Sequence, residues 1–414
     1  MRQAGKVFFV FIAIFVLALG GCGNRTPVGE DNTAEWARDL KLRKAQFTPA
    51  EQLEIITWYD YLPQEVFDLF TRTYGTKIVP TLVNSNEEMF ELLRKNPGKY
   101  DLITPSDYMV TKMIKGGLLH RLDHKNLPNI ESLDEDVRRT KYDRGLQYCV
   151  PLFRTSLGIA FNIKYVSGIP RNWRFLAEQI RNDYFVFRVG ISKEMRFAMG
   201  VSLMLLGYSP NTTNSEEIAA ARDLLIDLVK KRGLVLLDTD TEERLVKNET
   251  LLGVVWSGSA ASALRKNPNI RFLLPEGQAL VTFDNAVISA ASTRARTAEL
   301  FINYLLIPQV CARMTDYNYF PNSNSSSLPF IQRLIRNGPG FLFPQEDERL
   351  FLEDLGENIT LYEEAWSEVQ QATPDAALVK LPLPKDGFFK GDAQVDNFSK
   401  QFGEDVKTKK NGTP

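Results

Sequence analysis

Short apolar runs alternate with stretches of helical spacing along most of the chain. Segments 53–57, 77–83 and 101–104 are predicted strands, because each is a brief apolar run between polar residues. Segments 86–95 and 107–119 are predicted helices, because their apolar residues recur every three or four positions. Strands that alternate with helices predict βαβ units and a mostly parallel sheet.

The same alternation continues through the second half of the chain. It predicts strands at 146–153, 157–162 and 280–289, helices at 218–231 and 298–306, and a strand-to-helix turn within 253–266. A chain of 414 residues exceeds the usual size of one domain. The pattern therefore predicts two α/β lobes.

The N-terminus has the form of an export signal. Arg2 and Lys6 precede the apolar run 7–19, and small residues follow before Cys22. This run of 13 residues is shorter than the roughly 20 that cross a bilayer as a permanent helix. The ending Leu-Gly-Gly-Cys resembles a bacterial lipobox, which implies lipidation of Cys22 and an exported, membrane-anchored lipoprotein facing the periplasm or the cell exterior. The alternative is a buried structural cysteine.

Both ends of the chain are expected to lie outside the lobes. Residues 1–21 are the predicted signal peptide, and the polar residues 22–50 are the predicted lipidated tether. Residues 373–414 are rich in Lys, Asp, Gly and Pro, which predicts a polar tail.

Composition and the absence of motifs exclude several functions. Fifty basic and fifty-one acidic residues give a net charge of −1, so no global field favours nucleic acid. His120 and His124 are interpreted as a surface pair, and Cys149 and Cys311 as small core residues, so neither a metal nor a cofactor is expected. No phosphate loop, zinc-protease motif or nucleophile elbow is present, and paired carboxylates such as 363–364 leave only a weak hydrolase alternative.

Aromatic residues beside carboxylates or hydroxyls follow several predicted strands. The clusters are 57–61, 104–108, 256–259 and 283–285. Ligands of open α/β sheets gather beyond the carboxyl ends of the strands. Aromatic faces attract ammonium groups, and carboxylates hold them with charge-assisted hydrogen bonds. Each cluster alone is also compatible with core packing or helix capping, and 257–259 could bind an anion, but the four together favour a site for an aliphatic cation.

At these residues the chain resembles the spermidine/putrescine-binding proteins of polyamine ABC transporters. The resemblance covers about residues 53–370 and is carried by 57–63, 85–93, 100–119, 148–162, 206–213, 252–260 and 361–366. It implies an α/β, bilobed type II periplasmic-binding-protein fold with a hinge and a ligand cleft. It also implies lobe boundaries at 51–153 plus 283–330 for lobe 1 and 154–282 plus 331–372 for lobe 2.

The resemblance also transfers binding roles to particular residues. Rings would come from Trp58, Tyr61, Tyr108 and Trp256, acids from Asp60, Asp284 and Glu194, and a hydrogen bond from Ser106. Tyr59, Asp107 and Tyr319 adjoin these positions and complete the candidate polyamine site. Several positions depart from the family: Phe197 replaces an acid, Thr282 a tryptophan and Leu352 a glutamine, and Phe320 aligns with an expected tyrosine, to which Tyr319 is adjacent. The lost acid favours a diamine such as putrescine over spermidine.

The resulting hypothesis is reversible capture without chemistry. The protein would be a monomer that binds putrescine, spermidine or both, and would deliver them to an ABC permease and ATPase complex in the membrane. An enzyme is not expected. The alternative is a polyamine-sensing or surface interaction lipoprotein with the same fold and an altered pocket.

Overall fold

The computed structural model describes residues 45–373. The predicted signal peptide, the lipidation site Cys22, most of the tether and nearly all of the polar tail lie outside these residues. Among the described residues, no helix is both long and apolar enough to cross a bilayer.

Ten strands within residues 45–373 form one continuous sheet. They are β1 (Gln52–Trp58), β2 (Lys77–Val83), β3 (Leu102–Ile103), β4 (Cys149–Asn162), β5 (Val189–Ser192), β6 (Val235–Leu237), β7 (Leu252–Trp256), β8 (Ile270–Leu273), β9 (Ala279–Ile288) and β10 (Arg349–Phe351). The strand order is β2-β1-β3-β9-β4-β7-β5-β6, with β10 on β9 and β8 on β4.

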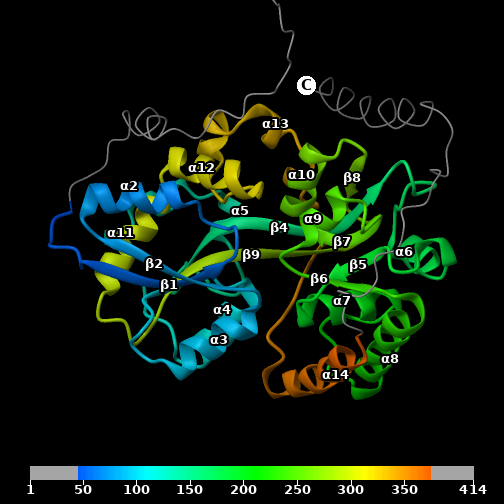
Figure 1. Ribbon diagram of the computed structural model, residues 1–414. Coiled ribbons are helices and arrows are strands. Elements are labelled where there is room, and N and C mark those ends of the chain that lie inside the picture. The colour runs from blue at the N-terminus through cyan, green and yellow to red at the C-terminus, as the bar shows by residue number, and fades with distance from the viewer. Residues whose placement is uncertain (1–44, 374–414) are drawn as a thin grey trace, which may run out of the picture. The chain divides into compact units, whose positions relative to one another are not determined.

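Thirteen α-helices among the described residues surround the sheet (Figure 1). They are α2 (Gln64–Tyr74), α3 (Asn86–Lys95), α4 (Asp107–Lys115), α5 (Glu135–Arg138), α6 (Trp173–Ile180), α7 (Met195–Leu205), α8 (Ser215–Arg232), α9 (Thr241–Val246), α10 (Ser257–Lys266), α11 (Ala295–Leu305), α12 (Pro308–Asn318), α13 (Arg333–Arg336) and α14 (Ile359–Ala372).

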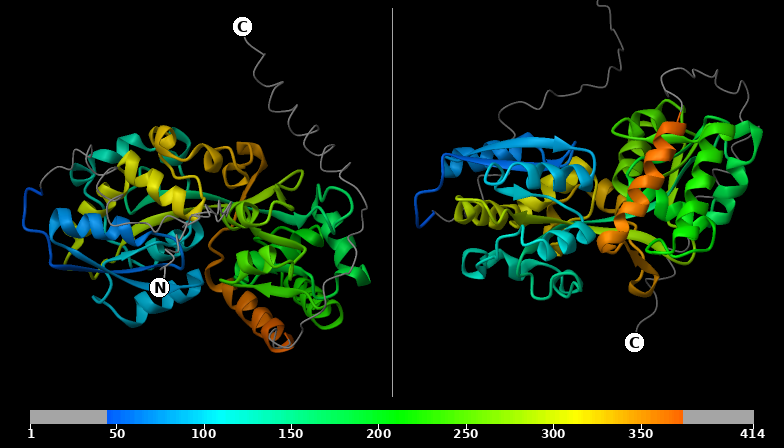
Figure 2. Two further views of the ribbon diagram at one scale, coloured as in Figure 1. Left: turned by 45° about the horizontal axis from the view of Figure 1, so that its top comes forward. Right: turned by 90° about the horizontal axis from the view of Figure 1, so that it is seen from below.

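The elements form two lobes joined by crossing strands. We call β1–β3 with α2–α4, α11 and α12 lobe 1, and β5–β8 with α6–α10 and α14 lobe 2. β4 and β9 run through the middle of the molecule from one lobe to the other (Figure 1). The segment after β10 makes a third connection and leads into α14, which packs against α8 of lobe 2 (Figure 2).

The long crossing strand β4 differs from the sequence prediction. Two strands were expected at 146–153 and 157–162, because the polar residues 154–156 interrupt the apolar run. The structure has one strand, which pairs with β9 as far as Ser156 and with β7 and β8 from Leu157 onward. Its pairings with β7, β8 and β9 are antiparallel, and so is the pairing of β3 with β9. The expected parallel arrangement holds within each lobe, for β1 with β2 and β3 and for β5 with β6 and β7, and for β10 with β9.

Each lobe has its own apolar core. In lobe 1, the ring of Phe70 lies 4.8 Å from that of Phe301 and 5.2 Å from that of Tyr304. In lobe 2, Leu237, Val255 and Phe272 belong to a separate buried cluster. Two cores within one sheet allow the lobes to move about the crossing strands without unpacking either core.

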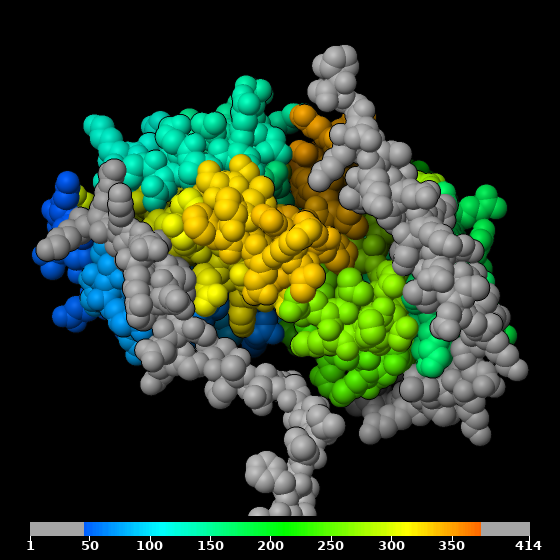
Figure 3. All heavy atoms as spheres, turned by 90° about the horizontal axis from the view of Figure 1, so that it is seen from above, coloured from blue at the N-terminus to red at the C-terminus, as the bar shows by residue number. Residues whose placement is uncertain are grey.

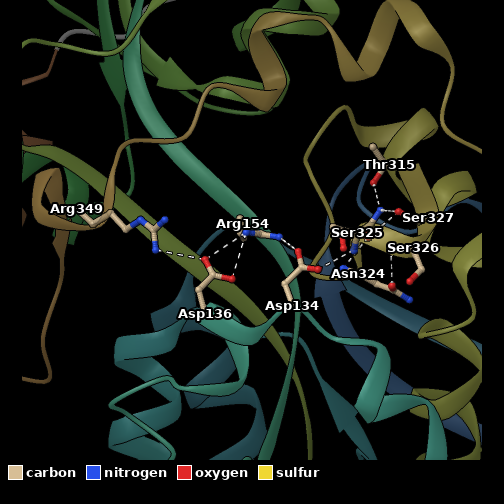
Figure 4. A network of polar contacts seen from close by, with 10 residues as sticks. Asp134, Asp136, Arg154, Thr315, Asn324, Ser325, Ser326, Ser327 and Arg349 are labelled. Carbon is tan, nitrogen blue, oxygen red and sulfur yellow. Dashed lines mark hydrogen bonds and ion pairs between the residues drawn. The ribbon is translucent and has the colours of Figure 1, made fainter. Parts of the chain in front are cut away.

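An ion-pair network lies where lobe 1 meets the crossing strands (Figure 4). Arg154 of β4 is paired with Asp134 and, at 3.3 Å, with Asp136. Asp136 also pairs with Arg349 of β10 at 3.4 Å, and the Ser325 amide donates to Asp134 at 2.9 Å. The network therefore connects α5, β4 and β10 at the hinge.

The surface above the hinge is closely packed. Figure 3 shows the yellow segment that contains α12 and α13 beside the green α10 of lobe 2. A Cβ atom at Gly340 would lie 2.2 Å from the carbonyl oxygen of Tyr319 and 3.3 Å from the Cβ atom of Ala261. Only glycine fits this approach, which brings the chain after α13 against α10 and the end of α12.

Candidate functional site

A cavity of about 420 Å³ lies between the two lobes. Several of its lining residues follow directly from strand ends: Trp58 ends β1, Ser192 ends β5 and Trp256 ends β7. The crossing strands β4 and β9 contribute Thr155, Thr282 and Asp284. The site therefore lies at the carboxyl edge of the sheet, where α/β proteins bind their ligands.

The structure brings nine of the eleven predicted binding residues to this cavity. They are Trp58, Tyr59, Asp60, Tyr61, Ser106, Glu194, Trp256, Asp284 and Tyr319. These residues come from segments spread over most of the described chain. Their contacts with a ligand remain a prediction.

Asp107 and Tyr108 do not line the cavity. The carboxylate of Asp107 accepts hydrogen bonds from the Thr282 hydroxyl at 3.0 Å and the Phe283 amide at 3.2 Å. The Tyr108 hydroxyl donates to Glu87 at 3.0 Å. Burial raises the pKa of Asp107 to about 7. Both residues support the cavity wall from behind, because α4 begins at Asp107 and points these side chains towards β9 and α3.

Asp284 is the buried acid of the crossing strand β9. Its carboxylate accepts a hydrogen bond from the Ser106 hydroxyl at 3.0 Å. Asn86 fixes Ser106 by accepting from its amide at 2.9 Å. Burial raises the pKa of Asp284 to about 6, although the bond from Ser106 opposes the shift. An ammonium group at this carboxylate would restore its charged form.

Tyr61 lies beside Asp284 in the wall of the cavity. Its hydroxyl is buried and makes no hydrogen bond of ordinary geometry. Burial and the carboxylate of Asp284 raise the pKa of Tyr61 well above its usual value. The ring of Tyr61 packs edge-on against Phe153 of β4 at 4.9 Å. The ring of Tyr61 is therefore fixed, and its hydroxyl is buried next to the carboxylate of Asp284.

Glu194 and Trp256 form the matching pair on lobe 2. The Trp256 indole N–H donates to the Glu194 carboxylate at 3.0 Å. Burial raises the pKa of Glu194 to about 8, and the carboxylates of Glu87, Asp284 and Asp238 add to the shift. Without a ligand the cavity therefore keeps Glu194 mostly protonated at neutral pH.

Aromatic rings complete the wall on lobe 1. The Trp58 indole N–H donates to the carbonyl of Thr104 at 2.8 Å, which fixes that ring. Tyr59 is 48% exposed at the rim. Asp60 has a φ of 49° and accepts a hydrogen bond from the Tyr317 hydroxyl at 3.4 Å. The turn after β1 thus directs a ring and an acid into the cavity.

Of the departures from the family pattern, Phe197 and Leu352 lie outside the cavity lining, whereas Thr282 and Phe320 belong to it. Phe197 is buried behind the cavity, with its ring 4.5 Å from Trp256 and 6.5 Å from Tyr108. Leu352 is buried against Gly200 and does not line the cavity. Thr282 does line it. Phe197 and Leu352 are apolar residues where the family has polar ones, so neither side chain can bind an ammonium group.

Several lining residues were not expected from the sequence. They are Lys193, Asp238, Glu242, Glu243, Lys266 and Tyr317. The short strands β5 and β6, which end just before Lys193 and Asp238, were not predicted. Had these two strands been predicted, their carboxyl ends would have indicated Lys193 and Asp238 as candidate lining residues.

The remaining predicted groups of possible chemical importance lie elsewhere. Cys149 and Cys311 are free and buried, as expected of core residues, and burial raises the pKa of both thiols. His124 contacts the carbonyl of Leu146 at 2.8 Å. Among residues 45–373, no group of three or more His, Cys, Asp or Glu side chains could hold a metal ion.

Two α/β lobes joined by crossing strands, with a cavity between them, define a bilobed ligand-binding protein of the type II periplasmic class. Residues 65–334 match the family described as bacterial extracellular solute-binding protein. The chain belongs to this family, whose members bind solutes for transport and are not enzymes.

Three known proteins are similar to this chain over most of their length. The chain is 28% identical over 343 residues to spermidine/putrescine-binding periplasmic protein 1 of Haemophilus influenzae, covering 81% of this chain and 94% of that protein. It is 28% identical over 320 residues to the putrescine-binding periplasmic protein SpuD of Pseudomonas aeruginosa, covering 73% and 86%. The crystal structure of the TpPotD lipoprotein of Treponema pallidum superposes with a TM-score of 0.67 at 27% identity, covering 77% and 99%.

Proposed function

We propose that the protein captures polyamines and delivers them to an ABC transporter. The observation that carries the proposal is the cavity itself, which is lined by the acids Asp284 and Glu194 and by the rings of Trp58 and Trp256. Each ring attracts an ammonium group by roughly 0.5–2 kcal/mol. The names of the Haemophilus and Pseudomonas relatives include putrescine, which supports this class of ligand.

Capture needs binding and closure but no covalent step. An amine enters the open cleft, and the acids and rings replace its hydration water. Glu194 belongs to lobe 2, whereas Asp284 lies on the crossing strand β9 and is hydrogen-bonded to Ser106 at the start of α4 in lobe 1. A ligand that bridges these two acids therefore favours closure. The closed form then presents one surface to a permease and ATPase complex.

Export and anchoring at the membrane belong to the same proposal. The relatives above are named periplasmic proteins, and the Treponema neighbour is named a lipoprotein. The signal-like residues 1–21 are consistent with export, and Cys22 is consistent with a lipid anchor. The proposal also keeps the lobe boundaries at 51–153 plus 283–330 for lobe 1 and at 154–282 plus 331–372 for lobe 2. Failure of Cys22→Ser to release the protein from membranes would contradict the lipid anchor.

Calorimetry with putrescine, cadaverine, spermidine and spermine tests the function. Asp284→Asn or Trp256→Ala should weaken binding by at least about tenfold, or ~1.4 kcal/mol. Asp183→Asn is the matched control, because it removes a carboxylate that is 92% exposed and paired with Arg232 outside the cavity. Unchanged affinity in both cavity variants would refute the site, and no binding of any amine by the unaltered chain would refute the function.

A further inference from the structure

Two lysines line the same cavity as the acids. Lys193 is ion-paired with Asp238, and Lys266 is ion-paired with Glu242. All four side chains belong to lobe 2 and line the cavity. A site for a cationic ligand therefore already contains two ammonium groups of the protein.

The fold places each lysine beside its acid. Lys193 follows β5 and Asp238 follows β6, which are neighbouring parallel strands. The Lys193 amide also donates to the carbonyl of Leu237 at 2.9 Å, which holds the two strand ends together. The pair thus forms at the carboxyl edge of lobe 2, next to Glu194.

The second pair joins two helices at the same edge. Lys266 ends α10, and Glu242 lies in the first turn of α9. Glu242 also accepts a hydrogen bond from the Ser262 hydroxyl. The Glu242 side chain is 31% exposed, whereas the Lys266 side chain is 60% exposed. Glu242 is therefore held in place, and the lysine is the more accessible member of the pair.

A lysine side chain has the same chemistry as one end of a polyamine, namely a primary ammonium on a flexible chain of four carbons. We propose that Lys193 and Lys266 determine which polyamine binds, because they occupy Asp238 and Glu242 and so deny these acids to the additional ammonium groups of longer amines. This inference rests on the proposed capture of polyamines. It assigns the cavity to a short diamine in preference to a triamine or tetraamine.

The remaining acids of the cavity fit two ammonium groups. Asp284 and Glu194 have no ion-pair partner within residues 45–373 and lie among the aromatic rings. Glu243 also lines the cavity, but it is paired with Lys247, which does not. Asp60 lies at the exposed rim and accepts from Tyr317. Two largely enclosed carboxylates are thus free for a ligand.

Competition between tethered groups explains why the lysines discriminate. A third ammonium of a bound triamine is held near Asp238 by its own chain, but Lys193 is held there by the backbone. Both have high effective concentrations, so the exchange yields little net affinity. Asp238 lines the same cavity as Glu194, and its partner Lys193 directly precedes Glu194 in the chain, so the acid occupied by Lys193 adjoins the proposed diamine site.

Replacement of the lysines should open the cavity to longer amines. We expect Lys193→Met and Lys266→Met each to raise the affinity of the purified full chain for spermidine about three- to tenfold, with less than about a twofold change for putrescine. The double variant should extend the gain to spermine. Calorimetry at fixed ionic strength gives the ratio of the two affinities for each variant.

Two controls separate local competition from a general change of charge. Lys231→Met also removes one positive charge from an ion pair of lobe 2, with Asp227 on α8, but outside the cavity. It should leave the ratio unchanged. Adding Asp238→Asn to Lys193→Met should restore the original ratio, because the freed acid is then absent.

The outcomes distinguish this inference from the proposed function. Equal gains for all amines, or the same change in Lys231→Met, would overturn the role of the lysines while polyamine capture stands. If Lys193→Met does not fold, Lys193→Gln replaces it. No binding of any amine by the unaltered chain would instead refute the function itself.

Discussion

Lowering the pH from 8 to 6 should weaken polyamine binding by about a hundredfold. In the proposed function the ligand binds the ionised forms of Glu194 and Asp284, whose pKa values without a ligand are about 8 and about 6. Primary ammonium groups remain charged throughout this range, since their ordinary pKa is about 10. The pH dependence therefore comes from the protein.

The expected magnitude follows from the ionised fractions. Between pH 8 and pH 6 the ionised fraction of Glu194 falls from about one half to about 1%, or roughly fiftyfold, given its pKa of about 8. That of Asp284 falls about twofold, given its pKa of about 6. Together these changes weaken binding by about 2.7 kcal/mol.

Calorimetry in buffers of different ionisation enthalpy measures the linked proton directly. Binding at pH 7 should release about one proton, mostly from Glu194, because the arriving cation lowers its pKa. Glu194→Gln should abolish most of this release and flatten the affinity between pH 6 and pH 8. An affinity that does not vary with pH in the unaltered protein would refute the reasoning.

The same pKa shift has a consequence for stability. The pKa of Glu194 is raised from 4.5 to about 8 in the folded protein, so its neutral form stabilises the empty fold. This contribution is fully present below about pH 4.5 and is lost as the pH rises through about 8. Without a ligand, the unfolding temperature of the unaltered protein should fall as the pH rises over this range. The fall should be less steep in Glu194→Gln, which lacks the titrating carboxyl.

Two further predictions concern the hinge side of the molecule. Gly258→Ala should lower the free energy of unfolding by about 1–3 kcal/mol. The added Cβ atom would lie 2.6 Å from the ring of Phe320. A urea midpoint equal to that of the unaltered protein would contradict this packing. Asp136→Asn should lower the free energy of unfolding by about 0.5–1 kcal/mol, because it breaks the partly exposed ion pairs with Arg154 and Arg349. This difference in stability should shrink in 1 M salt, which thermal unfolding at two salt concentrations can test.

Local signals explain which elements the sequence predicted well. The expected strand 77–83 and helix 86–95 coincide with β2 and α3. The helix begins after Ser85, whose hydroxyl accepts from the Glu88 amide at 3.1 Å, a cap that is visible in the sequence. The bilobed fold is confirmed, since it depended on a resemblance spread over many such segments.

Long-range pairing explains what the sequence did not predict. Thr155 and Ser156 appear as a polar break between two strands, but in the structure they pair with Thr282 and Val281 of β9. A partner more than a hundred residues away leaves no local pattern. Lys193 was not predicted at the cavity for the same reason. The acid that pairs with it, Asp238, follows the neighbouring strand β6 and is 45 residues away in the chain.

The crossing strands link ligand contacts to the position of the lobes. Thr155 of β4 lines the cavity, whereas its neighbour Arg154 lies in the ion-pair network with Asp134, since successive residues of a strand point to opposite faces. Thr282 of β9 lines the cavity and donates to Asp107 of lobe 1. We therefore expect substitutions on these strands to change binding and closure together.

Lys193 and Lys266 lie outside the crossing strands, on elements that belong wholly to lobe 2. Their replacement changes which acids a ligand can reach while leaving β4 and β9 intact. A shift in the ratio of triamine to diamine affinity in these variants would consequently report on charge recognition alone. A substitution at Thr155 could not separate recognition from hinge bending, because closure contributes to the affinity for every amine.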